Sequence, residues 1–115
     1  MSENADSIRG ILPVVHMPYH TDLRIDFDTL RREVDHLFTT GAHGLCLALV
    51  SDTLRLTAPE RMEMPTRLVE FAQGRGPVII SVGAESTVQA RAFARAAEDA
   101  GAGAIMAIPP LSQGL

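Results

Sequence analysis

The residues best suited to chemistry lie in a short polar loop, residues 50–56, between a predicted strand and a predicted helix. Ser51, Asp52 and Thr53 bring two hydroxyls and a carboxylate to this loop. Backbone N–H groups ahead of a helix bind anions, so this loop could hold a substrate carboxylate. The same three side chains would equally hydrogen-bond the loop backbone, as Ser, Thr and Asp do in turns. From the spacing alone, both interpretations stay open.

Other chemistry-bearing residues give weaker signals. His16 and His20 are close in sequence, but they lie on a predicted strand and its following loop, where two side chains do not converge on one metal. Cys46 is the single cysteine and lies in an apolar run, which indicates a buried thiol. The glycines at 74 and 76 precede a strand, whereas a phosphate-binding glycine loop follows one. The sequence therefore predicts no metal site and no nucleotide-binding loop.

Composition limits the class of protein. The chain has 115 residues, 46% of them hydrophobic, and a net charge of -4, which indicates one globular domain. All ten basic residues are arginine and form no basic run, so we expect no nucleic acid or membrane partner. Residues 1–9 are polar and acidic and resemble no secretion signal, so they are expected to form a flexible tail on a cytoplasmic protein.

The strands and helices that would position the polar loop alternate regularly along the sequence. Four apolar runs, expected to be strands, alternate with three helical segments, which is typical of parallel βαβ units. In such folds function gathers at the carboxyl ends of the strands. The expected strands are residues 11–16, 45–49, 78–82 and 104–108.

Capping residues indicate where the helices begin. Asp26 is a predicted N-cap, and Thr57 with Glu60 forms a capping box, as does Ser86 with Gln89. Within the second helix, Pro65 is predicted to cause a kink or a break.

A series of short motifs occurs in a fixed order along almost the whole chain after its first nine residues. Together they resemble the dihydrodipicolinate synthase and N-acetylneuraminate lyase family of class I aldolases. The motifs, with x for positions that carry no resemblance, are G-I-L-P at residues 10–13 followed by Pro18, I-D-F-D-x-L-R-R-x-V-D-H-L at 25–37, G-A-x-G-L at 41–45, L-T-x-x-E-R at 56–61, P-V-I-x-x-V-G-A at 77–84 and A-G-A-x-A at 100–104, before the prolines at 109 and 110.

This resemblance implies a (β/α)₈ barrel, of which residues 10–115 would form the N-terminal half, with four strands and three helices. It implies a lyase or aldolase that acts on a 2-oxo acid such as pyruvate through a lysine Schiff base, with no metal or organic cofactor. The Schiff-base lysine and the relay tyrosine belong to later strands, so no catalytic residue is expected in this chain. A homo-oligomer is also expected.

Residue by residue, the family's G-T-T-G-E loop corresponds to residues 48–52, and its two threonines become Leu49 and Val50. By this resemblance the N–H groups near Val50 and Ser51 hold the substrate carboxylate, while Ser51 and Asp52 shape the pocket. Tyr19 is interpreted as a packing residue.

Two alternatives to an enzyme half remain. Four parallel strands would leave two apolar edges, at residues 11–16 and 104–108, and such edges pair with other chains. The chain would then be a non-catalytic half-barrel that assembles with itself. The other alternative is an inactive gene fragment.

Overall fold

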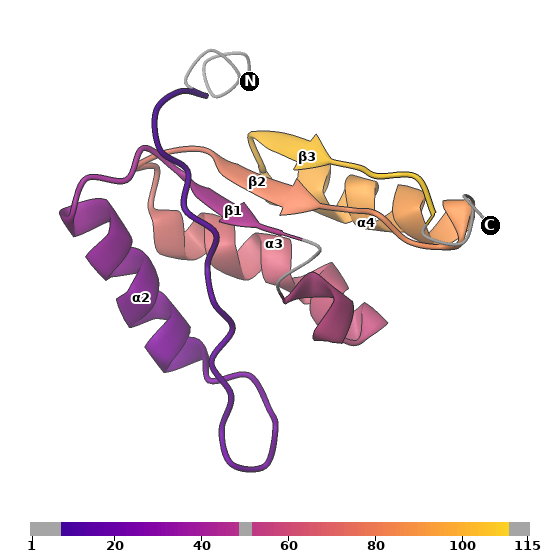
Figure 1. The fold of residues 1–115 in the computed structure, drawn as a ribbon, viewed down its shortest axis with the longest axis horizontal. Coiled ribbons are helices and arrows are strands. Elements are labelled where there is room, and N and C mark those ends of the chain that lie inside the picture. The colour runs from indigo at the N-terminus through magenta and orange to yellow at the C-terminus, as the bar shows by residue number, and fades with distance from the viewer. Residues whose placement is uncertain (1–7, 49–51, 111–115) are drawn as a thin grey trace.

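The computed structural model describes residues 8–48 and 52–110, which form one parallel sheet and the helices that cover it (Figure 1). The sheet has the order β1-β2-β3, and each strand pairs in parallel with the next. The strands are β1 (Leu45–Leu47), β2 (Val78–Ser81) and β3 (Ala104–Met106), and the helices are α2 (Phe27–Thr39), α3 (Ala58–Ala72), α4 (Thr87–Ala100) and the short 3₁₀ helix η1 (Thr53–Arg55). The predicted alternation of strands and helices is thereby confirmed for three strands.

The prediction that residues 11–16 form the first strand is wrong. This segment lies beside β1 but forms only one parallel bridge, between Val14 and Cys46. In that bridge the Cys46 N–H donates to the Pro13 carbonyl at 2.9 Å. Pro13 itself has no N–H, so the ladder cannot continue toward the N-terminus. At the other end the Met17 N–H donates to the Asp52 carboxylate at 3.0 Å instead of to β1. The described residues therefore contain three strands of the expected four-stranded half-barrel.

One face of the sheet packs against the helices and forms the core. Parallel neighbours in register present their side chains to the same face, and Leu45 is paired with Val78 while Leu47 is paired with Ile80. All four are at least nine-tenths buried. They join a cluster of buried helix side chains: Leu30, Val34, Met64, Leu68, Phe93 and Ala97.

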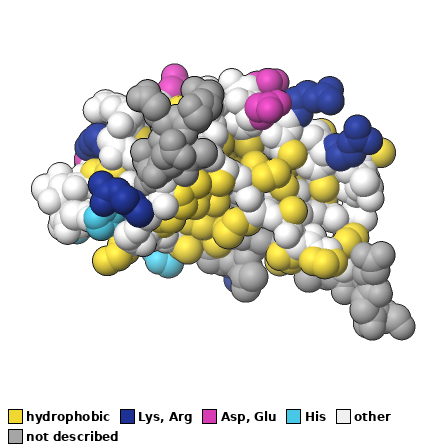
Figure 2. All heavy atoms as spheres, turned by 90° about the horizontal axis from the view of Figure 1, so that it is seen from above, with side chains coloured by type: hydrophobic (Ala, Val, Ile, Leu, Met, Phe, Trp, Pro, Cys, Tyr) yellow, Lys and Arg dark blue, Asp and Glu magenta, His cyan; other side chains and the backbone are white. Residues whose placement is uncertain are grey.

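The opposite face of the sheet is apolar too, but no described helix packs on it. Cys46, Ile79 and Ala104 form one row across it, because Cys46 pairs with Ile79 and Ile79 with Ala104. Exposure rises toward the margins, where Val14 is 37% and Met106 39% exposed. Figure 2 shows hydrophobic side chains spread over one side of the molecule. Two apolar strand edges were expected; the one at residues 104–108 contains the strand β3, whereas residues 11–16 form no strand.

The helix starts agree with the capping signals. The Asp26 carboxylate accepts the Thr29 N–H at 3.1 Å, and the Ser86 hydroxyl accepts the Gln89 N–H at 3.2 Å. Of the two predicted capping boxes, Thr57 with Glu60 forms the full reciprocal one, whereas Ser86 caps α4 through its hydroxyl and the reciprocal bond from the Gln89 side chain is not formed. The predicted break at Pro65 is absent, because α3 continues through it. Pro65 is fully buried among core residues, and this packing offsets the lost backbone hydrogen bond. Among the described helices, none has the length and apolar character needed to cross a bilayer.

Replacing the N-cap of α3 tests how much local capping stabilises this fold. Thr57→Ala removes the hydroxyl that accepts the Glu60 N–H at 3.2 Å, and we expect the free energy of unfolding to fall by about 1 kcal/mol. Thr66→Ala, the same change at an exposed site on the same helix, is the matched control and should have little effect. Chemical denaturation measures both. Equal losses in the two variants would contradict the capping account.

Candidate functional site

Asp52 is the best-placed of the predicted site residues. It precedes η1, and its Oδ2 accepts the Met17 N–H at 3.0 Å. This bond joins Asp52, in the loop after β1, to the carboxyl end of the segment that forms the single bridge with β1. Val50 and Ser51, the other two predicted site residues, lie outside the described residues.

Thr53 serves the loop itself. It is only 1% exposed, and its hydroxyl donates to the Ala48 carbonyl at 2.8 Å, while its N–H donates to the same oxygen at 3.3 Å. Of the two interpretations that the sequence left open, hydrogen bonding to the loop backbone is the one that describes Thr53. This pair of bonds closes the loop that carries Asp52.

Glu33, on α2, is a site residue that sequence reasoning missed. Its Oε1 accepts the His16 N–H at 2.7 Å, so Glu33 and Asp52 bind two consecutive backbone N–H groups from different sides. Burial raises the pKa of Glu33, the His16 N–H opposes this shift, and the negative charge of Asp52 adds to it. No local pattern marks Glu33 in the sequence, because its partner lies 17 positions away.

Tyr19 follows the same segment and lies in the field of Asp52 and Glu60. Its side chain is 39% exposed. Burial raises the pKa of the phenol most, followed by the charges of Asp52 and Glu60, while Arg55 opposes the shift. Tyr19 was interpreted as a packing residue, and the structure adds that its hydroxyl lies in the electrostatic field of Asp52.

Arg61, on α3, fixes the carboxyl end of β2. Its Nη2 donates to the Gly83 carbonyl at 2.8 Å and lies 3.4 Å from the Ser81 carbonyl oxygen. The guanidinium carbon lies 3.9 Å from the centroid of the Phe93 ring, and burial lowers the pKa of the group. Arg61 also lines a cavity of about 180 Å³, together with Leu54, Glu85, Ile108 and Pro109. The end of β2 is thus held by a cation and borders an open space.

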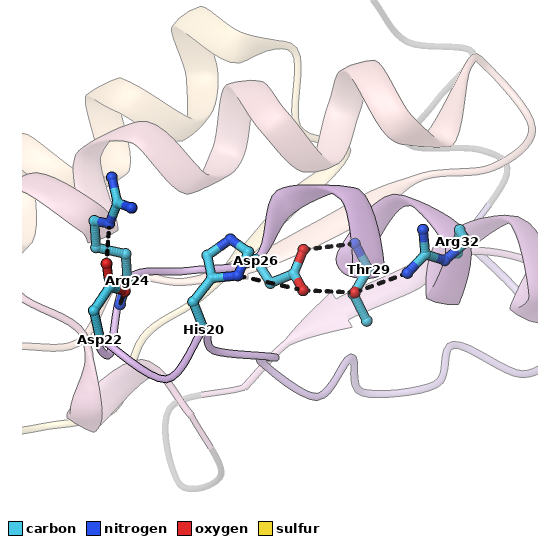
Figure 3. A network of polar contacts seen from close by, with 6 residues as sticks. All are labelled: His20, Asp22, Arg24, Asp26, Thr29 and Arg32. Atoms are coloured by element: carbon cyan, nitrogen blue, oxygen red, sulfur yellow. Dashed lines mark hydrogen bonds and ion pairs between the residues drawn. The ribbon is translucent and has the colours of Figure 1, made fainter.

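Histidines take structural positions in the described parts of the chain. His20 Nδ1 lies 3.8 Å from Oδ2 of Asp26, which also accepts the Thr29 hydroxyl at 2.7 Å (Figure 3). His43 Nδ1 accepts the Ile11 N–H at 3.0 Å. His36 is exposed on α2. Across residues 8–48 and 52–110, no three His, Cys, Asp or Glu side chains are arranged to hold a metal ion. Cys46 is buried, as expected, and burial raises the pKa of its thiol.

Residues 7–113 match the model of the dihydrodipicolinate synthetase family. The chain belongs to this family. It is 32% identical over 104 residues to the 4-hydroxy-tetrahydrodipicolinate synthase of Methanococcus vannielii, covering 90% of this chain and 36% of that protein. It is 35% identical to the L-2-keto-3-deoxyarabonate dehydratase of Azospirillum brasilense, covering 89% of this chain and 33% of that protein. The chain therefore spans about a third of the length of these relatives.

Solved structures agree with this assignment. The family protein YagE of Escherichia coli K12, solved in complex with pyruvate, superposes with a TM-score of 0.88 at 25% identity, over 94% of this chain and 37% of that one. The N-acetylneuraminate lyase of Proteus mirabilis superposes with a TM-score of 0.85 at 25% identity, over 93% and 37%. The three-stranded sheet with its helices thus has the arrangement of one part of these barrel enzymes.

The raised pKa of Glu33 predicts how stability depends on pH. A carboxyl whose pKa is raised by folding contributes stability below its ordinary value of 4.5, and this contribution is lost as pH rises through the folded-state pKa. Glu33→Gln keeps an oxygen for the His16 N–H but does not ionise. Its unfolding free energy, relative to the unmodified chain, should therefore increase from acidic to neutral pH.

The matched control is Glu70→Gln, at an exposed position on α3. Urea denaturation across this pH range measures all three proteins. A constant difference between Glu33→Gln and the unmodified chain at every pH would contradict the assignment.

Proposed function

We propose that this chain forms the N-terminal part of a lyase or synthase that acts on a 2-oxo acid such as pyruvate through a lysine Schiff base. In that reaction the lysine amine adds to the ketone carbon, water leaves, and the resulting iminium accepts electrons during the carbon–carbon step. All ten basic residues of this chain are arginine, so the proposal places the lysine outside these 115 residues. The chemistry needs no metal or organic cofactor.

Within this chain, the proposed task of the loop after β1 is to hold the substrate carboxylate. The N–H groups near Val50 and Ser51 would donate to it, and Asp52 would set the position of the loop. The observation that supports this is the hydrogen bond from the Met17 N–H to Asp52 at 3.0 Å. That bond ties Asp52 to the neighbouring segment before any substrate arrives, and a residue that is already positioned reduces the cost of binding.

The loop differs from the family pattern at the two threonine positions, which are Leu49 and Val50. Backbone N–H groups do not depend on side-chain identity, so carboxylate binding is compatible with this change. A proton relay through a threonine hydroxyl is not compatible with this change, because leucine and valine carry no hydroxyl. We therefore propose that this half retains binding and that any proton relay in the complete enzyme uses other groups.

Titration with pyruvate tests the binding role on this chain alone. We expect the amide resonances of residues 50–53 and of Met17 to shift in ¹⁵N NMR spectra, because the carboxylate would contact the loop that Asp52 holds. Pyruvamide, which lacks the carboxylate, is the matched control ligand and should leave these resonances unchanged. Equal shifts with both compounds, or shifts confined to other residues, would overturn the proposed role.

A chimera tests the reaction. Residues 7–113 replace the matching third of the Methanococcus vannielii synthase, which would supply the rest of the barrel. Borohydride in the presence of pyruvate should label a lysine of the chimera and no side chain of the 115-residue chain, because reduction traps the iminium on an amine.

In the chimera, Asp52→Ala should slow labelling about tenfold, the effect of losing roughly one charge-assisted hydrogen bond. Asp28→Ala, at an exposed position on α2, should leave the labelling rate unchanged. A chimera that unfolds cooperatively but takes up no label would contradict the proposal, and so would side-chain labelling of the isolated chain.

A further inference from the structure

We propose that a cavity at the amino ends of the strands binds a phosphate group, either as inorganic phosphate or as part of a small phosphate ester. The cavity has a volume of about 230 Å³ and lies where α3 and α4 end and β2 begins, at the opposite ends of the strands from Asp52 (Figure 1). The inference is therefore independent of the reaction proposed above. The polar groups of the cavity come from Arg9, His43, Gly74, Arg75 and Gly76.

His43 contributes a hydrogen-bond donor whose position is fixed. Its Nδ1 accepts the Ile11 N–H at 3.0 Å, so the neutral imidazole carries its proton on Nε2. The backbone N–H of His43 donates to the Ile11 carbonyl at 2.8 Å, which ties the same two residues together a second time. Among residues 8–48 and 52–110, no group accepts a hydrogen bond from Nε2. This donor is therefore available to a ligand.

Gly10 brings Arg9 to the same cavity. The φ angle of Gly10 is 71°, and a Cβ at this position would lie 2.2 Å from Nδ1 of His43, so glycine is needed for the chain to pass this close to the ring. Arg9 directly precedes it and forms no ion pair within the described parts of the chain. Its planar guanidinium matches the oxygens of a phosphate group.

Two backbone N–H groups complete the set of donors. Gly74 and Gly76 line the cavity, and the N–H of neither glycine has an acceptor among the described residues. Turns that contain left-handed residues present N–H groups to anions, and the φ angles of Gln73 and Gly74 are 51° and 71°. A Cβ at Gly74 would meet no atom within 4 Å, so the space beside this turn is open.

The charges around the cavity favour an anion over a cation. The ends of α3 and α4 would by themselves attract a cation, but Arg75 already occupies that place. Its Nε donates to the Ala72 carbonyl at 3.0 Å and its Nη2 to the Phe71 carbonyl at 2.8 Å, while Asp35 balances its charge at 2.7 Å. No described Asp or Glu lines the cavity. The positive charge of Arg9 is thus left for a ligand.

The number of donors favours phosphate over a carboxylate. A phosphate group has at least three acceptor oxygens, so it can bind the guanidinium, the imidazole and the turn at once, whereas a carboxylate has two. The cavity also has room for a few more atoms, because a water molecule in the liquid occupies only about 30 Å³. The two glycines precede β2, so this site differs from the nucleotide-binding loop that the sequence excludes.

Titration with phosphate, followed by ¹⁵N NMR spectroscopy of the 115-residue chain, tests the proposal. We expect saturable shifts of the Gly74 and Gly76 amides and of Nε2 of His43, because these groups would donate to the phosphate oxygens. Sodium chloride at equal ionic strength should leave these resonances unchanged. Glycerol 3-phosphate distinguishes the two sources of the ligand: tighter binding than that of phosphate identifies an ester, weaker binding identifies the free ion, and both results support the site.

Two variants remove single donors. Arg9→Gln removes the charge, and His43→Asn keeps an acceptor for the Ile11 N–H but removes the Nε2 donor. Each should raise the Kd for phosphate at least about tenfold, the effect of losing one hydrogen bond to a charged group. Arg31→Gln, at an exposed position on α2, is the matched control and should bind phosphate as the unmodified chain does.

Three results would overturn the proposal. The first is a set of phosphate-induced shifts that do not saturate or that lie outside the residues of the cavity. The second is an unchanged Kd in both donor variants. The third is a response of the Gly74 and Gly76 amides to magnesium chloride and not to phosphate, which would show that the helix ends attract cations despite Arg75.

Discussion

The hydrogen bond between the Asp52 carboxylate and the Met17 N–H is the constraint on which this end of the molecule depends. It diverts a donor that would otherwise extend the sheet, so the segment before Met17 leaves β1 after one bridge. It also joins the loop after β1 to that segment. A buried N–H left without a partner would cost about 1–3 kcal/mol, so Asp52 and the segment that carries Met17 are held together.

Two further polar contacts extend this constraint across the ends of the strands. Glu33 binds the N–H next to that of Met17, and Arg61 binds the carbonyl of Gly83 beyond β2. Each links a helix to the end of a neighbouring strand segment. In a parallel fold these ends are where ligands bind. The family assignment and this arrangement therefore point to the same edge of the sheet.

Interactions between residues close in sequence could be predicted, whereas interactions between residues far apart in sequence could not. The capping box of Thr57 is encoded within four residues, and it forms as predicted. Pro13 was included in a predicted strand because its neighbours are apolar, and only the pairing with β1 reveals that its missing N–H ends the ladder. Pro65 was predicted to kink or break a helix, and the break does not occur, because core packing overrides that local preference. Glu33 and Arg61 were not predicted as site residues, because the groups they bind lie 17 and 22 positions away in the sequence.

Hydrogen exchange at the Met17 amide is the most direct test of the central constraint. In the unmodified chain this amide should be protected, and Asp52→Ala should accelerate its exchange, because the acceptor is removed. The neighbouring His16 amide, held by Glu33, should stay protected in the same variant. If Met17 exchanged equally fast with and without the Asp52 carboxylate, the loop would not be held as described, and the account of the site would be wrong.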